Sequence, residues 1–260
     1  MKSVLLVDIG NTNITVGAGR GGRISSVRRF PTAEKRTTPP DARLKGLIHR
    51  HNADDAVLCS VVPEYSLQWR RAIAKLTRKN PLVVDHRLNL GVRISYPRPS
   101  TIGADRLANA CAVYEKYGAP AIVADFGTAL TFDVISPEGA YVGGVIAPGL
   151  PFMTRYLSEK TALLPEITLK GPCPCIGKST KTAMRTGART GCRGMVREIV
   201  TGIKSGLRVK NVKLCATGGY ARWAMGDLDM PFTIDKNLTI YGLYRIYELN
   251  RSRAAGSDRK

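Results

Sequence analysis

The sequence has no apolar run that approaches the ~20 residues needed to cross a bilayer. Met1-Lys2-Ser3 and the four apolar residues after it are too short for the core of a signal peptide, because Asp8 ends the run. These absences argue against a membrane protein and against a secreted one. We therefore expect a cytoplasmic protein with no membrane partner.

Close cysteine and histidine clusters are also missing. The six cysteines contain no C-x-x-C pair, and Cys173-Pro174-Cys175 has neither a second pair nor a nearby histidine to complete a zinc site. All three histidines lie in the first half of the chain, where a solvated surface role is the default. We expect reduced thiols that mostly pack in the interior.

Acidic residues are scarce relative to basic ones. Lys and Arg number 40 against 20 Asp and Glu, so the formal net charge is +20. A basic surface attracts nucleotides, acidic metabolites or nucleic acids. However, no basic tract is interleaved with aromatic residues, and no zinc finger, basic zipper or RRM signature is present. We expect no specific nucleic-acid partner.

The sequence contains a repeated unit, at Val4–Val16 and again at Ala121–Ile135. Each copy has an apolar run of strand length, the pattern D-x-G, small hydroxyl or amide residues, and a second β-leaning run. The D-x-G patterns begin at Asp8 and Asp125. The repeat predicts two similar lobes, each starting with a strand–turn–strand unit.

This unit has the chemistry of a phosphate site. A glycine turn lets backbone N–H groups approach an anion, and Asn or Thr side chains add neutral donors. A carboxylate at the end of a buried strand is costly unless it is paired, hydrogen-bonded or beside a metal, and a Mg²⁺ shared with a nucleotide would satisfy it. The alternative is a pair of hairpins with simple Asx turns. The same carboxylate offset in both copies favours a phosphate cleft between two lobes.

Strand and helix patterns alternate along the chain, which indicates an α/β fold. At 260 residues the chain is long enough for two domains of about 120 residues each. We predict an N-terminal lobe at 1–117, a C-terminal lobe at 118–250, and a disordered basic tail at 251–260.

Two further segments have features of a binding site. Two prolines make Tyr96–Ile102 an extended connector to a helix that starts near Gly103. Asp105 can cap this helix, but Arg106 in its first turn opposes the helix dipole unless it serves an anion. Thr217-Gly218-Gly219 follows a strand and offers a second place where backbone can meet a nucleotide.

Taken in chain order, these motifs resemble type III pantothenate kinase over residues 4 to about 250. The segments that carry the resemblance are Asp8-x-Gly10-Asn11-Thr12, Ser60-Val61-Val62-Pro63, Gly103-Ala104-Asp105-Arg106, Asp125-Phe126-Gly127-Thr128-Ala129, Gly143-Gly144-Val145-Ile146-Ala147-Pro148-Gly149, Thr161-Ala162-x-Leu164-Pro165, Gly177-Lys178-Ser179-Thr180, Thr217-Gly218-Gly219 and Leu238-Thr239-x-x-Gly242-Leu243.

The resemblance implies an actin-like ATPase fold, with two ribonuclease-H-like lobes, a nucleotide cleft between them, and a homodimer. It also implies ATP-dependent phosphorylation of pantothenate to 4'-phosphopantothenate, the first step of coenzyme A synthesis. The cofactors it implies are ATP, Mg²⁺ and a monovalent cation, K⁺ or NH₄⁺.

The resemblance further implies a role for individual residues. Asp105 is the general base, and Asp125 binds the monovalent cation, while Asp8 organises Mg²⁺ through water. The remaining residues contact nucleotide or substrate. For ATP these are Asp8, Ile9, Gly10, Asn11, Thr12, Asn13, Ile14, Thr15, Thr128, Gly218 and Gly219. For pantothenate they are Tyr96, Gly103, Ala104, Asp105, Arg106 and, from the partner subunit, Thr180.

Two positions depart from the family pattern. Leu130 stands where a small hydroxyl residue is common, and Ser179 where asparagine is common.

The alternative functions are another kinase of the same fold acting on a sugar or acetate, a non-enzymatic protein that binds anions or nucleic acid, and a regulatory accessory role.

Overall fold

The computed structural model describes residues 3–32, 41–226 and 228–257. It divides into two compact units. The first unit contains the chain up to Gly118, the short segment Gly139–Tyr141, and residues from Asn237 onward. The second unit contains Ala119–Glu138 and Val142–Lys236. No helix within the described ranges is both long and apolar enough to cross a membrane.

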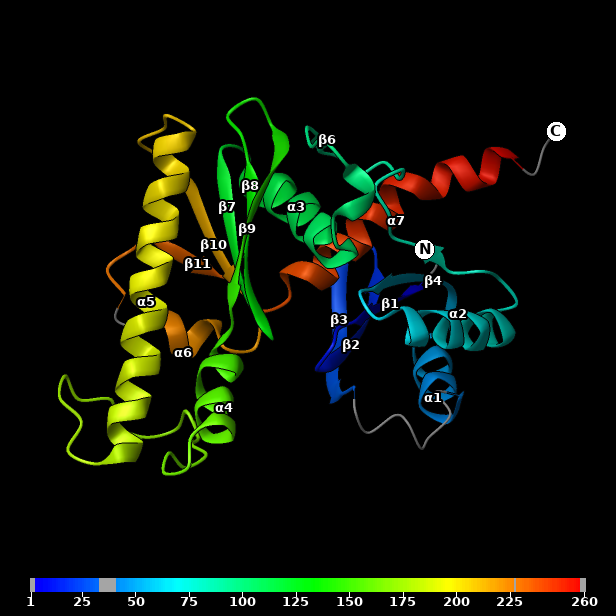
Figure 1. Ribbon diagram of the computed structural model, residues 1–260. Coiled ribbons are helices and arrows are strands. Elements are labelled where there is room, and N and C mark those ends of the chain that lie inside the picture. The colour runs from blue at the N-terminus through cyan, green and yellow to red at the C-terminus, as the bar shows by residue number, and fades with distance from the viewer. Residues whose placement is uncertain (1–2, 33–40, 227, 258–260) are drawn as a thin grey trace. The chain divides into compact units, whose positions relative to one another are not determined.

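Strands and helices are interspersed along the chain (Figure 1). In order they are β1 (Ser3–Ile9), β2 (Asn13–Arg20), β3 (Arg23–Pro31), α1 (Asp41–His51), β4 (Ala53–Ser60), α2 (Pro63–Thr77), β5 (Leu82–Val83), β6 (Arg93–Ile94), the 3₁₀ turn η2 (Pro99–Thr101), α3 (Ala104–Tyr117), β7 (Ala121–Phe126), β8 (Ala129–Ile135), β9 (Ala140–Pro148), α4 (Leu150–Lys160), α5 (Thr180–Gly206), β10 (Lys213–Thr217), α6 (Ala221–Met225), β11 (Phe232–Ile234) and α7 (Leu238–Ser257).

The first unit is built on a five-stranded sheet of order β3-β2-β1-β4-β5. β1 pairs antiparallel with β2 and parallel with β4. Val4 to Val7 of β1 are fully buried, as expected for a central strand covered on both faces. One core cluster joins the sheet to α1 and α2 through Leu44, Trp69 and Ile73.

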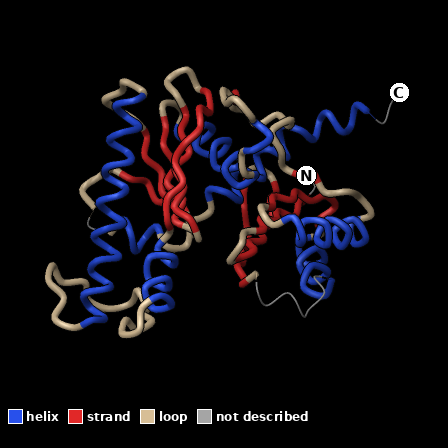
Figure 2. The backbone as a smooth tube through the Cα atoms, viewed as in Figure 1, coloured by secondary structure: helices blue, strands red, loops and turns tan. Residues whose placement is uncertain are grey.

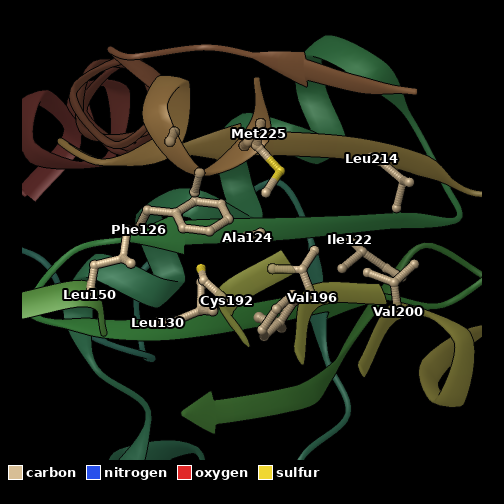
Figure 3. Close-up of a cluster of buried hydrophobic side chains, with 14 of the residues drawn as sticks. Ile122, Ala124, Phe126, Leu130, Leu150, Cys192, Val196, Val200, Leu214 and Met225 are labelled. Carbon is tan, nitrogen blue, oxygen red and sulfur yellow. The ribbon is translucent and has the colours of Figure 1, made fainter. Parts of the chain in front are cut away.

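The second unit repeats this plan. The sheet that contains β7 has six strands in the order β11-β10-β7-β8-β9-β6. In it β7 pairs antiparallel with β8 and parallel with β10. α5 contributes Cys192, Val196 and Val200 to a core that also contains Ile122 and Phe126 of β7 (Figure 3). Leaving aside β6 at its edge, this sheet repeats the order 3-2-1-4-5 of the first sheet, with β7 counted as strand 1. The sequence repeat predicts two similar lobes but not this order.

The C-terminal part differs from the sequence-based expectation. The prediction assigned residues 237–250 to the second lobe, but α7 groups with the first unit. The reason is close packing: the Cα of Gly242 lies so near Ala108 of α3 that an added Cβ would overlap its carbonyl oxygen. The predicted disordered tail is also wrong for 251–257, which continue α7 as a helix (Figure 2). Residues 258–260 of that tail lie outside the described residues.

Candidate active site

The first loop of interest is the hairpin turn after β1. Asn11, Thr12 and Asn13 are exposed, and the N–H of Gly10 donates to the carbonyl of Asn13 at 2.9 Å. This arrangement fits the predicted phosphate loop, because it presents short polar side chains to solvent at a glycine turn.

Thr32 holds this loop from the end of β3. Its hydroxyl donates to the carbonyl of Gly10 at 2.7 Å, and its N–H donates to the carbonyl of Thr12 at 2.7 Å. These bonds occupy two carbonyl oxygens that would repel an anion. The sequence analysis missed Thr32, since nothing in its local pattern links it to a turn 20 residues earlier.

Asp8 lies next to last in β1, half-buried. In the sheet it faces Thr15 across the antiparallel pair with β2 and Cys59 across the parallel pair with β4. Thr15 and Cys59 are both buried. The neighbouring strands thus fix the backbone position of Asp8 on both sides.

The thiol of Cys59 is influenced by two carboxylates of the first unit, those of Asp8 and Asp105. Burial raises the pKa of its thiol well above the usual range, and the negative charges of Asp8 and Asp105 raise the pKa further. A hydrogen bond to Asp8 acts in the same direction. Cys59 is therefore a neutral thiol that donates to Asp8 and is not a nucleophile. The sequence analysis took it for a packing residue.

Asp105 sits in the first turn of α3, whose N-cap is Gly103. Its Oδ1 accepts the N–H of Arg106 at 2.8 Å, so it satisfies an unpaired donor of the helix end without being the capping residue itself. A Cβ at position 103 would lie 2.6 Å from that oxygen, so any larger residue there would displace the Asp105 carboxylate.

Burial raises the pKa of Asp105, and this is the dominant effect. The N–H and the positive charge of Arg106 act in the opposite direction without cancelling it. A carboxyl group with a raised pKa in a partly buried position has the character of a catalytic acid or base.

Tyr96 lies just beyond β6, with an exposed ring. The ring packs against buried Tyr141, with centroids 6.3 Å apart and planes tilted by 58°. This contact fixes the ring while leaving its surface accessible to a ligand.

The second unit repeats the aspartate environment of the first. Asp125 is next to last in β7 and half-buried, and it faces Thr131 of β8 and Thr217 of β10. The carboxyl ends of β7 and β10 therefore lie side by side. This brings the predicted turns after Asp125 and Thr217 together within one unit.

Two other turns, at Gly218 and Gly149, pack closely against the loop after β7 because glycine has no side chain. A Cβ on Gly218 would lie 2.5 Å from the Asp125 carboxylate, and its φ is +91°. Gly149 is the N-cap of α4, and a Cβ on it would overlap the carbonyl oxygen of Thr128. Thr128 itself is exposed, which suits a residue expected to contact a nucleotide.

Thr180 is the first residue of α5 and is exposed. Ser179 caps the helix: its side chain accepts the N–H of Thr182, and the Thr182 hydroxyl accepts the N–H of Ser179 at 3.0 Å. The departure from asparagine at position 179 therefore keeps a good N-cap residue.

The carboxylates of the first unit suit Mg²⁺ as the implied divalent cation. No group of three or more His, Cys, Asp or Glu residues that could hold a metal occurs within the described part of the chain. Mg²⁺ does not need such a cage, because it usually keeps several waters and binds one or two carboxylates plus substrate phosphates. Asp8, half-buried at the end of β1 beside the exposed polar turn, fits that requirement.

Comparison with known proteins shows the family of this chain. The sequence matches the family model of type III pantothenate kinase over residues 4–202. It is 35% identical over 250 residues to the Type III pantothenate kinase of Agathobacter rectalis, covering 94% of this chain and 96% of that protein. It is 41% identical over 249 residues to that of Methylacidiphilum infernorum, covering 95% and 88%.

Solved structures agree on the fold. A Campylobacter jejuni protein grouped with the Baf family superposes with a TM-score of 0.63 at 19% identity, over 95% of this chain and 99% of that one. MreB5 of Spiroplasma citri bound to ADP gives 0.51 at 12% identity, over 100% and 99%. These likenesses show the actin-like ATPase fold. The family match and the two relatives above show that the chain belongs to the type III pantothenate kinases.

Proposed function

We propose that this chain transfers the terminal phosphoryl group of ATP to the hydroxyl group of pantothenate, with Asp105 as the general base. The observation that carries the proposal is the position of Asp105. It is a partly buried carboxyl group with a raised pKa, and it lies close enough to Asp8 for both charges to act on Cys59. Phosphoryl transfer needs mainly alignment and charge neutralisation, which the residues around Asp105 can supply.

In the first unit, residues 8–15 would bind the phosphates of ATP. The exposed Gly10–Asn13 turn offers backbone N–H groups and neutral side chains, while Thr32 occupies two of its carbonyl oxygens. Asp8 would hold Mg²⁺ through water, and bound Mg²⁺ supplies neutralisation of phosphate charge. The Cys59 thiol would keep the Asp8 carboxylate in place.

The substrate hydroxyl would donate to the carboxylate of Asp105. That carboxylate is already oriented by the N–H of Arg106, so it can accept the proton as the phosphoryl group transfers. The Arg106 guanidinium would offset the negative charge of pantothenate. Tyr96, Gly103 and Ala104 would complete the wall of this substrate site.

In the second unit, Thr128, Gly218 and Gly219 would contact the nucleotide. Gly218 and Gly149 leave no room for side chains against the loop after β7, so its backbone is closely supported. Asp125 would hold a monovalent cation, K⁺ or NH₄⁺, at the end of its strand.

We also propose a homodimer, in which Thr180 reaches the substrate of the partner subunit. The support is a set of exposed apolar side chains in the second unit, which a second copy would cover. Ile146, Phe152, Tyr156, Leu163 and Ile176 are between 48% and 90% exposed. Phe152 and Tyr156 stack with ring centroids 5.2 Å apart.

A cytoplasmic location is part of the proposal. All six cysteines are free, four of them buried, which suits a reducing compartment.

The test is a coupled assay of the purified protein with ATP, Mg²⁺, K⁺ and pantothenate. We expect ADP release that depends on pantothenate and is not supported by glucose or acetate. Turnover on a sugar or acetate instead would favour another kinase of this fold. Salt-sensitive DNA binding without any ATP turnover would favour a nucleic-acid-binding role.

A further inference from the structure

A pocket of about 660 Å³ lies within the first unit, between α1, the last turn of α2 and the start of β4. This volume is in the range of ~300–1,000 Å³ that is typical of small-molecule sites. Ile48, Ala53 and Leu76 form its apolar part. All three also belong to or pack against the buried core cluster of this unit, so the apolar surface has a fixed base.

The polar part of the pocket comes mostly from one face of α1. Lys45, Ile48 and His49 are spaced i, i+3 and i+4, which places them side by side on that helix. Lys45 and His49 are exposed, and neither forms an ion pair with a residue in the described ranges. Asn52 adds an amide, and no acidic residue is among the described residues that line the pocket. These groups favour a ligand that accepts hydrogen bonds and carries negative charge.

The ends of two helices indicate where the charge of such a ligand lies. α1 and α2 both end beside the pocket, near Asn52 and Leu76. The negative end of a helix dipole disfavours an anion. Lys45 lies about 10 Å along the helix axis from Asn52, toward the middle of α1. The negative charge therefore fits the Lys45 end, and an apolar body fits the end formed by Ala53 and Leu76.

The pocket is at the opposite end of the sheet from the proposed phosphate loop. In the parallel pair of β1 with β4, Ala53 is paired with Ser3, whereas Cys59 is paired with Asp8. Six residues of extended strand separate Ala53 from Cys59, a distance of ~20 Å. A small ligand in the pocket therefore does not reach the Asp8 carboxylate.

We propose that this pocket binds an amphipathic carboxylate whose apolar body is a hydrocarbon chain. The carboxylate accepts hydrogen bonds from Lys45 and His49, and the chain lies against Ile48, Ala53 and Leu76. The pocket is then a second ligand site of this protein, separate from the catalytic one.

A titration of the full chain with octanoate tests the proposal. A non-hydrolysable ATP analogue and pantothenate are both present in excess, so that octanoate does not occupy the catalytic site. We expect saturable binding by calorimetry at constant ionic strength. Octan-1-ol, which lacks the charge, should bind at least about tenfold more weakly. Acetate, which lacks the chain, should show no saturable binding, because it buries no apolar surface.

Gly46 allows the pocket to be filled by mutation. It lines the pocket on an exposed turn of α1, and a Cβ there meets no atom within 4 Å. Gly46→Phe puts a ring in the space of the hydrocarbon chain and should weaken octanoate binding at least about tenfold. Gly46→Ala adds only a methyl group and should bind octanoate as the natural protein does. Both residues suit a helix better than glycine, so both variants should fold.

Two matched double variants test the polar groups. Lys45→Gln with His49→Gln should weaken octanoate binding by at least about tenfold, through loss of charge-assisted hydrogen bonds. Arg71→Gln with Lys75→Gln changes an exposed pair with the same i, i+4 spacing on α2, outside the pocket lining, and should leave binding unchanged. Thermal unfolding midpoints check that each variant is folded.

Any of four results would overturn the proposal. They are no saturable binding of octanoate, equal binding of octan-1-ol, equal binding by Gly46→Phe and Gly46→Ala, and equal weakening in the two double variants. Since the titration requires no turnover and the variants lie outside the catalytic site, its outcome is independent of whether pantothenate is the substrate.

Discussion

Asp105 is a residue whose fold-stabilising and chemical roles conflict. Its carboxylate accepts the N–H of Arg106 at the start of α3, yet burial raises its pKa, so the charged form is disfavoured in the folded protein. Sequence patterns could single out Asp105 and Arg106, because an arginine in a first helical turn is unusual. They could not identify Cys59, whose importance depends on strand register with Asp8.

This conflict predicts a pH-dependent gain in stability for Asp105→Asn. An unfolded aspartate ionises near pKa ~3.9, whereas the folded pKa is higher. As pH rises through that interval the unfolded state loses its proton first, so the natural protein loses stability and stays less stable above it. At pH 7, Asp105→Asn should raise Tm by a few degrees, where ~2–4 °C corresponds to about 1 kcal/mol. Below about pH 3.5 the gain should vanish.

Asp85→Asn is the matched control with the opposite sign. The hydrogen bond from exposed Arg87 lowers the pKa of Asp85, so its charged form stabilises the folded state at neutral pH. That variant should lower Tm slightly at pH 7 and lose its effect in acid. A gain from Asp105→Asn that is the same at every pH would contradict the burial argument.

At the scale of elements, the two sheets were largely predictable and the close contacts of their turns were not. Two apolar runs with the same D-x-G spacing indicate two similar strand–turn–strand units, and both strands pair as expected. That Gly218 must be glycine follows only from the parallel pairing of β7 with β10.

Gly218→Ala should therefore destabilise the second unit. The added Cβ would meet the Asp125 carboxylate and the Phe126 backbone at 2.5–2.6 Å, in a backbone conformation with φ of +91°. Such strain costs about 1–3 kcal/mol, measured here by thermal or urea unfolding. Gly219→Ala is the control, since a Cβ there meets no atom within 4 Å. Equal losses of stability in both variants would show that the contact at Gly218 does not matter.

At the scale of the whole molecule, the repeat in the sequence predicted two related units, and the structure shows the same strand order in both. The sequence did not reveal that α7 returns to the first unit. Its apolar residues, including Leu243 and Ile246, indicate a buried helix. They do not indicate which of the two sheets the helix covers. The +20 charge likewise gives no guide to function, although it suits anionic ligands.

The proposed dimer predicts complementation between inactive subunits. If Thr180 acts on the substrate of the partner, a heterodimer of an Asp105→Asn subunit and a Thr180→Ala subunit retains one intact site. Differently tagged subunits, co-expressed and purified through both tags, should then show about half of the natural activity per dimer. Absence of rescue in a heterodimer of confirmed composition would place Thr180 outside the partner's site.

The turnover of Asp105→Asn with ATP, Mg²⁺, K⁺ and pantothenate tests the central claim most directly. Because asparagine keeps the shape of the side chain but cannot accept the proton, kcat should fall by about 10²–10⁴-fold. KM values should change little, and Asp105→Asn should remain folded. A kcat within about threefold of the natural enzyme would contradict the assignment of Asp105 as the general base.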